Sequence, residues 1–226
     1  MNLERLAKSV KNNLSYLASS EQEKENLDRI IAAIHVIDRV FFVKHKSDAY
    51  IDTALPIGYN QTISQPSTVA RMLMLANLET GNSLLELGAG SGWNASIAGY
   101  IIYPGKVLSL DIVPQLVEEA CQNLNKLRMN LNHEDSQKLS HIEFKDCNIF
   151  KNLDFWQKKY DKIIITAGIE RNQETLIHEL AEKTLKEKGI LVCPHTYGPL
   201  IILKKESGKV SKNVTLEQYI FVPLLE

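Results

Sequence analysis

The segment Leu84-Leu-Glu-Leu-Gly-Ala-Gly-Ser-Gly-Trp93 constrains the fold more than any other part of the chain. Its short apolar run is typical of a buried strand, and glycines follow at every second position, Gly88, Gly90 and Gly92, before a helical pattern begins. Glycine permits positive φ and lets a ligand approach the backbone closely. The first N–H groups of the new helix are unpaired and favour an anionic ligand group. We therefore expect a ligand-binding strand-to-helix turn, with a tight turn that binds nothing as the alternative.

Strand and helix patterns alternate from Gly81 onward. Strand patterns cover 83–88, 106–110, 141–144, 160–166, 189–193, 199–204 and a stretch near 216–223, and helical patterns cover 92–102, 114–128 and 172–185. The polar stretch Asn130–Ser140 between them is expected to be a surface loop. This alternation predicts an α/β fold with a doubly wound, mostly parallel sheet.

The first 80 residues have a different pattern. Leucines recur at three- and four-residue steps from Leu3 and predict a helix that ends near Ala18. Ser20 with Glu23 has the pattern of a capping box for a second helix through about Val40. Residues 44–66 are expected to be irregular, and a third helix is expected after Pro66. The chain thus begins with a helical extension.

The composition limits the kinds of partner. The 226 residues are 44% hydrophobic and 23% charged, with a formal net charge of −1, as in ordinary globular proteins. This balance gives no electrostatic reason to expect nucleic acid or an anionic membrane as a partner. No apolar run approaches the ~20 residues needed to cross a bilayer, and the start lacks the apolar core of a signal peptide. The three cysteines show no CxxC or zinc spacing, so we expect a reduced, cytoplasmic setting and no metal. We also expect a monomer.

The glycine spacing and a later carboxylate indicate the kind of ligand. Dinucleotide-binding turns have the pattern G-x-G-x-x-G, whereas this chain has G-x-G-x-G. Asp111 ends the next strand, 19 residues after Gly92, where a carboxylate can accept both ribose hydroxyls of a nucleoside. Because Glu86 also precedes the glycines, the segment resembles the first motif of S-adenosylmethionine-dependent methyltransferases. That resemblance implies a Rossmann-like sheet, S-adenosylmethionine as cofactor and S-adenosylhomocysteine as product. An NAD-type site is the alternative.

The segment upstream narrows the resemblance. Leu55-Pro-Ile-Gly-Tyr-Asn-Gln-Thr-Ile-Ser-Gln-Pro66, which Ala49-Tyr-Ile-Asp52 precedes, resembles the signature of protein-L-isoaspartate O-methyltransferases. Further matches are Tyr160-Asp-Lys-Ile-Ile-Ile-Thr-Ala167, Leu176-Ile-His-Glu-Leu180, Gly189-Ile-Leu-Val192 and Phe221-Val-Pro-Leu224, so the likeness runs from about residue 25 to the end. It implies methyl transfer to the α-carboxylate of L-isoaspartyl residues in damaged proteins or peptides. The ester then collapses to a succinimide, whose hydrolysis restores some normal aspartate.

The same resemblance implies roles for individual residues. Ser64 is expected to hold the acceptor carboxylate with its hydroxyl, and the alternative is an N-cap for the helix after Pro66. Asp146 is expected to accept the adenine amino group, and the alternative is a solvated turn aspartate. The full set expected at the cofactor is Thr62, Ile63, Glu86, Gly88, Ala89, Gly90, Ser91, Gly92, Asp111, Ile112, Asp146 and Cys147. Within a single domain over 1–226, we expect a helical subdomain at 1–45, a substrate loop and helix at 46–80 and a cofactor-binding core at 81–226.

The chemistry makes modest demands on the protein. A carboxylate with a reference pKa of about 4 is ionised at neutral pH, so no general base is needed. Since the sulfonium methyl is already an activated electrophile, the remaining task is in-line placement of carboxylate, methyl and sulfur. A hydroxyl donor and backbone N–H groups are sufficient to hold the carboxylate.

Several positions depart from the family pattern. Asn60 replaces a turn glycine, and Asn tolerates a left-handed backbone. Residues 168–172 and 194–196 also differ, and Arg171 or His195 could contact substrate, with solvated loop residues as the alternative. Two further functions therefore remain open. One is a methyltransferase of the same fold for another peptide or small-molecule acceptor, and the other is an S-adenosylmethionine-binding protein without catalysis.

Overall fold

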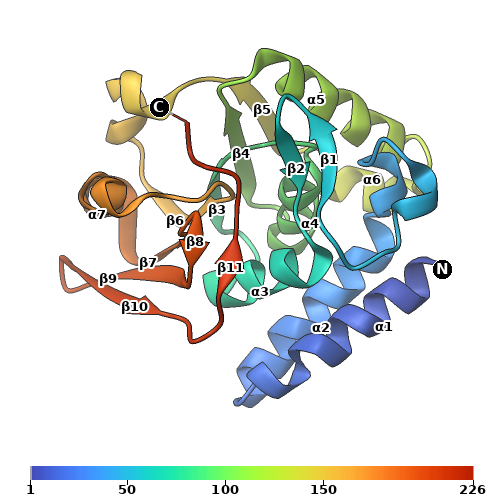
Figure 1. The fold of residues 1–226 in the computed structure, drawn as a ribbon, viewed down its shortest axis with the longest axis horizontal. Helices are drawn as coiled ribbons and strands as arrows, with labels where there is room; N and C mark the ends of the chain where they lie inside the picture. Colours follow the sequence, from blue (N-terminus) through green and yellow to red (C-terminus); the bar gives the residue numbers. More distant parts are fainter. Residues whose placement is uncertain (1, 226) are drawn as a thin grey trace.

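A seven-stranded sheet forms the centre of the computed structural model, which describes residues 2–225 apart from the side chains of residues 153 and 154 (Figure 1). Its order is β10-β9-β7-β6-β3-β4-β5, in which the five strands from β7 to β5 are parallel and β9 and β10 are antiparallel to their neighbours. The strands are β3 (Ser83–Leu87), β4 (Lys106–Asp111), β5 (Ile142–Asp146), β6 (Tyr160–Ile165), β7 (Leu185–Pro194), β9 (Leu200–Glu206) and β10 (Lys209–Val214). The predicted mostly parallel, doubly wound sheet is confirmed.

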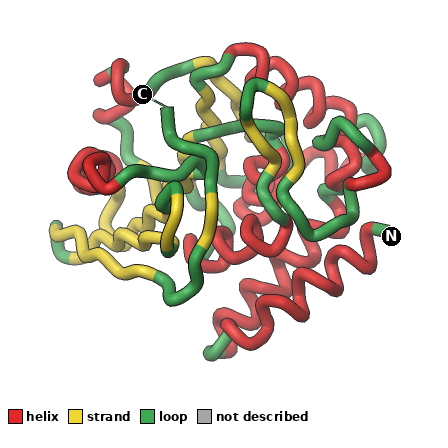
Figure 2. Tube along the Cα trace, viewed as in Figure 1, coloured by secondary structure: helices red, strands yellow, loops and turns green. Residues whose placement is uncertain are grey.

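Helices cover both faces of this sheet (Figure 2). One face packs against α3 (Pro66–Ala76), α4 (Trp93–Ile102) and α5 (Pro114–Arg128), and α1 (Leu3–Leu14) and α2 (Glu21–Val36) form an outer layer that packs on α3 and α4. The other packs against α7 (Glu174–Thr184) and the short 3₁₀ helices Ile149–Lys151 and Leu153–Gln157. Alternate residues of each strand point to opposite faces, so Leu84 joins the first core and Leu85 the second. Burial on both faces explains why these strands read as continuous apolar runs.

Four short segments differ from the sequence expectations. Helix α2 ends at Val36 rather than near Val40, because the Asp38 carboxylate accepts from the Val40 N–H and starts a 3₁₀ turn. The stretch expected as a loop contains α6 (His133–Lys138), whose N-cap Asn132 accepts from the Asp135 N–H at 2.9 Å. The strand expected near 216–223 shrinks to β11 (Tyr219–Ile220), and β10 was not predicted.

The stretch 44–66, expected to be irregular, contains a β-hairpin and a 3₁₀ turn at Lys46–Asp48. Strand β1 (Leu55–Gly58) pairs antiparallel with β2 (Gln61–Ile63). The turn residues Tyr59 and Asn60 have φ of 53° and 57°, the left-handed pair that a tight hairpin turn requires. The tolerance predicted for Asn60 is therefore confirmed. In Figure 1 the hairpin stands beside α4, over the carboxyl ends of the parallel strands.

The last residues of the chain cross the same edge of the sheet. Strand β11 pairs with β8 (Tyr197–Gly198), and a parallel bridge joins Pro223 to Gly168. We call residues 218–225 the C-terminal strap. Together the hairpin and the strap cover the carboxyl ends of β3 and β6. The strand order reverses between these two parallel strands, and open α/β sheets bind ligands at such a position.

Candidate active site

Three adjoining hollows lie at the carboxyl ends of the parallel strands. The sheet-end hollow contains about 520 Å³ of empty space, the glycine-loop hollow about 420 Å³ and the strap hollow about 710 Å³, each partly open to solvent. Gly88 lines the first two, and Thr62, Ser64 and Thr166 line the last two. Because they share lining residues, the three hollows are neighbours, arranged from the tip of β4 to the C-terminal strap.

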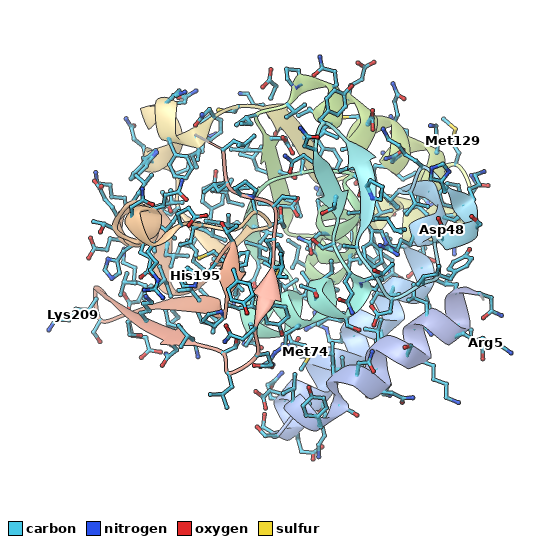
Figure 3. The ribbon with its side chains drawn as sticks, in the orientation of Figure 1. Arg5, Asp48, Met74, Met129, His195 and Lys209 are labelled. Atoms are coloured by element: carbon cyan, nitrogen blue, oxygen red, sulfur yellow. The ribbon has the colours of Figure 1, made fainter. Side chains whose placement is uncertain are left out.

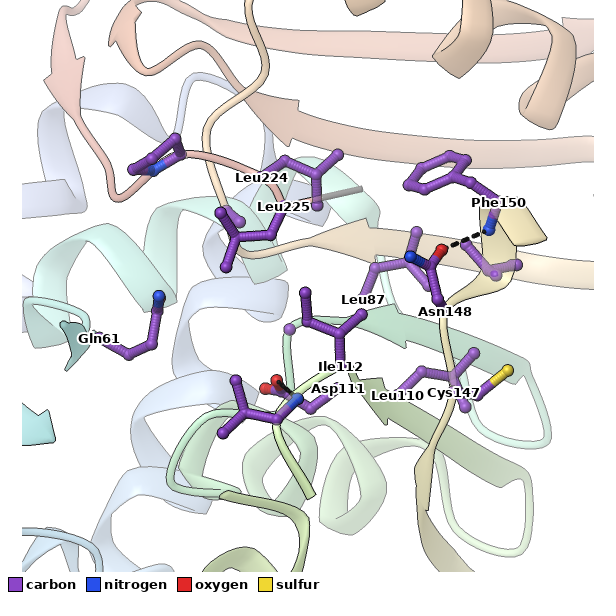
Figure 4. A pocket seen from close by; sticks show the side chains of 15 residues that line it. Gln61, Leu87, Leu110, Asp111, Ile112, Cys147, Asn148, Phe150, Leu224 and Leu225 are labelled. Atoms are coloured by element: carbon purple, nitrogen blue, oxygen red, sulfur yellow. Dashed lines mark hydrogen bonds between the residues drawn. The ribbon is translucent and has the colours of Figure 1, made fainter. Parts of the chain in front are cut away.

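The sheet-end hollow combines one carboxylate with apolar walls (Figure 4). Asp111 accepts from the Gly90 N–H at 2.9 Å and from the Val113 N–H at 3.0 Å, and an ionised carboxylate has further acceptor sites for a ligand. Ile112 is 36% exposed and offers an apolar surface beside it. The residues that line this hollow are Gln61, Leu87, Gly88, Leu110, Asp111, Ile112, Val113, Cys147, Asn148, Ile149, Phe150, Ala167, Pro223, Leu224 and Leu225. A largely apolar slot with one carboxylate to accept from hydroxyl groups fits a nucleoside.

The glycine loop is shaped by packing as well as by space for a ligand. Gly88, Gly90 and Gly92 have φ of 99°, 51° and 87°, in the left-handed region where a side chain would be strained. A Cβ on Gly88 would lie 2.4 Å from Thr166 Oγ1, and a Cβ on Gly92 would lie 3.0 Å from Phe144 Cζ. A residue larger than glycine at position 88 would therefore push the loop away from Thr166, at the end of β6. Gly88, Ala89, Gly90 and Ser91 all line the glycine-loop hollow.

Glu86 lies beneath this loop rather than in any of the three hollows. Its side chain is fully buried, accepts from Asn94 Nδ2 at 2.6 Å and also accepts from the Ser109 hydroxyl. Burial raises the pKa of Glu86 to about 7, while the two hydrogen bonds oppose that rise. Asn94 does line the glycine-loop hollow, so Glu86 orients a wall residue instead of facing the ligand space itself.

The hairpin brings its Thr-Ile-Ser residues to the junction of the hollows. Thr62 and Ser64 line both the glycine-loop and strap hollows, and Ile63 is buried beside them. Among the described residues the Ser64 hydroxyl has no hydrogen-bond partner, so it is free to hold a ligand. The N-cap alternative for Ser64 is wrong, because Gln65 occupies the N-cap of α3. The Ser67 N–H is instead satisfied by the Asp52 carboxylate, at 2.9 Å.

Of the two neighbours Asp146 and Cys147, only Cys147 lines a hollow. Cys147 lines the sheet-end hollow, and its N–H donates to the Asp111 carbonyl at 3.0 Å. Asp146 is exposed at the end of β5 and does not line that hollow. Asn148 takes the neighbouring position on the wall, where its side chain accepts from the Phe150 N–H at 3.0 Å (Figure 4).

The two altered segments hold the C-terminal strap in place. The Gly168 N–H donates to Val222 O at 2.7 Å, and the Phe221 N–H donates to Thr196 O at 3.0 Å. His195 belongs to the second of these segments, and its Nε2 is 2.8 Å from Glu174 Oε1 (Figure 3). Lys212 also pairs with Glu174, and the bonds from Lys212 and His195 lower the pKa of Glu174. His195 is thus mostly buried and hydrogen-bonded to Glu174, and Arg171 is exposed; neither lines the three hollows.

Sequence reasoning missed several wall residues. The hollows are also lined by Gln61, Thr166 and the strap. The sequence identified Gln61, Thr166 and residues 221–224 only as matches to the family pattern, without a role in the site. Thr166 follows directly after β6, so the rule that ligands lie at the carboxyl ends of parallel strands could have found it. The strap has no local signal, because only long-range pairing brings it to this edge.

The part of the chain that the structure describes has neither a metal-binding cluster nor a membrane-spanning helix. No group of three or more His, Cys, Asp or Glu side chains is arranged to hold a metal ion. Cys193 is fully buried, and burial raises the pKa of its thiol well above the usual range. Between residues 2 and 225, no helix is both long and apolar enough to cross a bilayer.

Comparisons with known proteins agree with this geometry. The family model described as protein-L-isoaspartate(D-aspartate) O-methyltransferase matches residues 12–226. Protein-L-isoaspartate O-methyltransferase 2 of Archaeoglobus fulgidus is 34% identical over 203 residues, which are 87% of this chain and 85% of the relative. The enzyme of that name from Pyrococcus abyssi is 37% identical over 180 residues, 76% of this chain and 75% of its own. A Plasmodium falciparum structure assigned to the same class, in complex with S-adenosyl-L-homocysteine, has the same fold, with a TM-score of 0.75 and 22% identity over 96% of this chain and 97% of that one.

Proposed function

Because the chain belongs to the protein-L-isoaspartate (D-aspartate) O-methyltransferase family, we propose that it transfers a methyl group from S-adenosylmethionine to the α-carboxylate of L-isoaspartyl residues in damaged proteins or peptides. One observation carries the proposal most directly. Neighbouring hollows with shared lining residues extend from Asp111, which suits a ribose, to Ser64, whose hydroxyl is free to hold a carboxylate. A donor and an acceptor can therefore meet at the hairpin.

The sheet-end and glycine-loop hollows fit the cofactor. Asp111 has acceptor sites left for two ribose hydroxyls, and Ile112 and Leu110 give the adenine an apolar surface. Cys147 and Asn148 line the end of the slot near β5, and the backbone of 88–91 lines the part that leads to Ser64. Bound there, S-adenosylmethionine supplies a methyl group that is already activated for transfer. The residues of the chain need only hold and shield it.

The strap hollow fits the acceptor. Its walls are Ala54, Thr62, Ser64, Gln65, Thr68, Thr166, Gln218, Tyr219, Ile220, Phe221 and Val222, and none of these side chains carries a charge. An isoaspartyl carboxylate is ionised at neutral pH, so it needs hydrogen-bond donors and no base. The Ser64 hydroxyl donates to one carboxylate oxygen and leaves the other to attack the methyl group in line. Methyl transfer leaves a methyl ester and S-adenosylhomocysteine, and the released ester closes to a succinimide with loss of methanol, without further help from the protein.

The proposed roles differ for the predicted residues. Ser64 is catalytic, Asp111, Ile112, Cys147 and the glycine loop bind the cofactor, and Thr62 and Ile63 shape the junction between the two hollows. Glu86 contributes through Asn94. An adenine contact by Asp146 would require its exposed side chain to turn toward the slot.

The test uses labelled S-adenosylmethionine with two peptides that differ only at one residue. The isoaspartyl peptide should gain a base-labile label, whereas its normal aspartyl twin should gain none. Label on neither peptide despite tight cofactor binding would favour another acceptor or a non-catalytic protein. The possibility of another acceptor arose from residues 168–172 and 194–196. These residues form backbone hydrogen bonds with the strap and do not line the acceptor hollow.

We further propose that the protein acts in the cytoplasm as a monomer on protein or peptide substrates, with no nucleic-acid partner. The near-neutral charge and the three free cysteines support this setting. We also propose a division of labour within one domain. Residues 1–45 brace the sheet, 46–80 present the acceptor side, and 81–226 hold the cofactor.

A further inference from the structure

Arg39 is a charged side chain that is completely buried behind the acceptor side of the site. It belongs to the 3₁₀ turn Arg39–Phe41, just after α2, and it is 0% exposed. Burial lowers the pKa of its guanidinium to about 10, and the nearby Asp52 charge opposes that fall, so the group is still ionised at neutral pH. Burying a charge is costly unless its hydrogen bonds are satisfied, which makes the surroundings of Arg39 informative.

Four backbone carbonyls surround this guanidinium. Nη1 donates to Ala49 O at 3.2 Å and to Ile51 O at 3.0 Å, and Nη2 donates to Thr53 O at 2.8 Å and to Ser64 O at 3.2 Å. The first three carbonyls precede the β1–β2 hairpin, and the fourth follows it. Arg39 therefore ties together the two ends of the hairpin that carries the Thr-Ile-Ser core.

The same group also contacts the cofactor side of the site. The Arg39 guanidinium carbon lies 5.4 Å from the centre of the Trp93 ring, and Trp93 is the first residue of α4 after the glycine loop. Trp93 Nε1 donates to Ile37 O at 2.9 Å, two residues before Arg39. Trp93 also lines the glycine-loop hollow. One rigid, planar cation thus contacts both the Ser64 carbonyl and Trp93, the residue that directly follows the glycine loop.

We propose that Arg39 is a positioning residue that sets Ser64 relative to the glycine-loop hollow for methyl transfer. The inference rests on the proposed function. In-line transfer depends on the separation of acceptor and methyl, and a displacement of about 1 Å can cost on the order of 100-fold in rate. A lysine has a single nitrogen and cannot span carbonyls on both sides of the hairpin, whereas the planar fork of arginine does.

The test compares Arg39→Lys and Arg39→Gln with Arg29→Lys. Arg29 is a matched control because its Nη1 and Nη2 also donate to two carbonyls, Leu78 O at 2.8 Å and Ile101 O at 3.2 Å, and it touches none of the three hollows. The Gln variant keeps two donors and buries no ammonium. Three properties of each variant are measured. They are the steady-state rate of methylation of an isoaspartyl peptide, the calorimetric Kd for S-adenosylhomocysteine, and amide hydrogen exchange over residues 61–65.

Both Arg39 variants are expected to lower kcat by about 10- to 100-fold while the Kd for S-adenosylhomocysteine changes by less than about threefold. Exchange over 61–65 should become faster in these variants and stay unchanged in Arg29→Lys. Unchanged kcat, or parallel loss of kcat and cofactor affinity, overturns the proposal. So does failure of both Arg39 variants to fold while Arg29→Lys folds, since Arg39 would then serve the fold as a whole.

Failure of the proposed function gives a different pattern. If the wild-type protein methylates no isoaspartyl peptide, the exchange data still decide whether Arg39 orders the hairpin. Faster exchange confined to 61–65 supports the positioning role for whichever acceptor is used, and unchanged exchange overturns it.

Discussion

Replacing Glu86 by glutamine should stabilise the protein above pH 7 and have much less effect near pH 4.5. In the folded chain the carboxyl group is completely buried between Asn94 and Ser109, and burial raises its pKa from 4.5 to about 7. Glutamine has the same shape, can accept from Asn94 and can donate to the Ser109 hydroxyl. It therefore resembles the protonated form of Glu86 at every pH.

The sign and size of the effect follow from linkage. A raised pKa means that the stability contributed by Glu86 is fully present below about pH 4.5 and is lost as pH rises through about 7. The difference between these pKa values, at about 1.36 kcal/mol per pH unit, corresponds to a loss on the order of 3 kcal/mol by pH 8. For a chain of this size that is a change in Tm of roughly 6–12 °C.

Denaturant unfolding of both proteins from pH 4.5 to pH 8 measures this difference. The free energy of unfolding of the variant minus that of the wild type should grow with pH, while contributions from all other groups cancel. Glu23→Gln is a control whose difference should stay nearly flat from pH 5 to pH 8 and shrink only near pH 4.5, since hydrogen bonds from Ser19 and Ser20 lower the pKa of Glu23. The stability contributed by Glu23 is present above pH 4.5 and falls as pH decreases. A Glu86 difference that is flat with pH would refute the reasoning from burial.

Three further predictions concern the site and its support. Ser64→Ala should lower kcat by about 10- to 100-fold with little change in the Kd for S-adenosylhomocysteine, because only the acceptor carboxylate loses a hydrogen-bond donor. Unchanged turnover would remove the catalytic role of Ser64. Asp111→Ala should do the reverse and weaken S-adenosylhomocysteine binding by about 10- to 100-fold in calorimetry, since it removes the ribose acceptor and the bond from Gly90. Asp52→Ala should lower the free energy of unfolding by about 1 kcal/mol, because the Ser67 N–H of α3 loses its cap, and no change in denaturant midpoint would contradict this.

Local signals in the sequence were enough for the core of the fold. The glycine turn, Asp111 and the helix that starts at Pro114 are each determined by neighbouring residues, so pattern and spacing locate them. The β1–β2 hairpin was missed because its strands are short and its turn carries Tyr59 and Asn60 instead of a glycine pair. The Ser207-Gly208 turn before β10, with φ of 52° and 75°, was a hairpin signal that could have been used.

The arrangement of side chains was less accessible from sequence. Strand β3 is buried on both faces, so alternation cannot show that Glu86 points under the glycine loop and away from the ligand space. The strap reaches the site only through pairing with residues more than 20 positions away, such as Tyr219 with Gly198 and Pro223 with Gly168. Arg39 would be read as a surface residue, and only the fold reveals four carbonyls around it.

The most direct test of the proposed repair function is to follow the isoaspartyl peptide through the whole reaction by chromatography and mass spectrometry. With the protein and S-adenosylmethionine present, the peptide should pass through a methyl ester and a succinimide, and part of it should become the normal aspartyl peptide. Ser64→Ala should slow the first step and leave the later, uncatalysed steps unchanged. An isoaspartyl peptide that stays unmodified, or a methyl group found at a site other than its α-carboxylate, would contradict the proposed reaction.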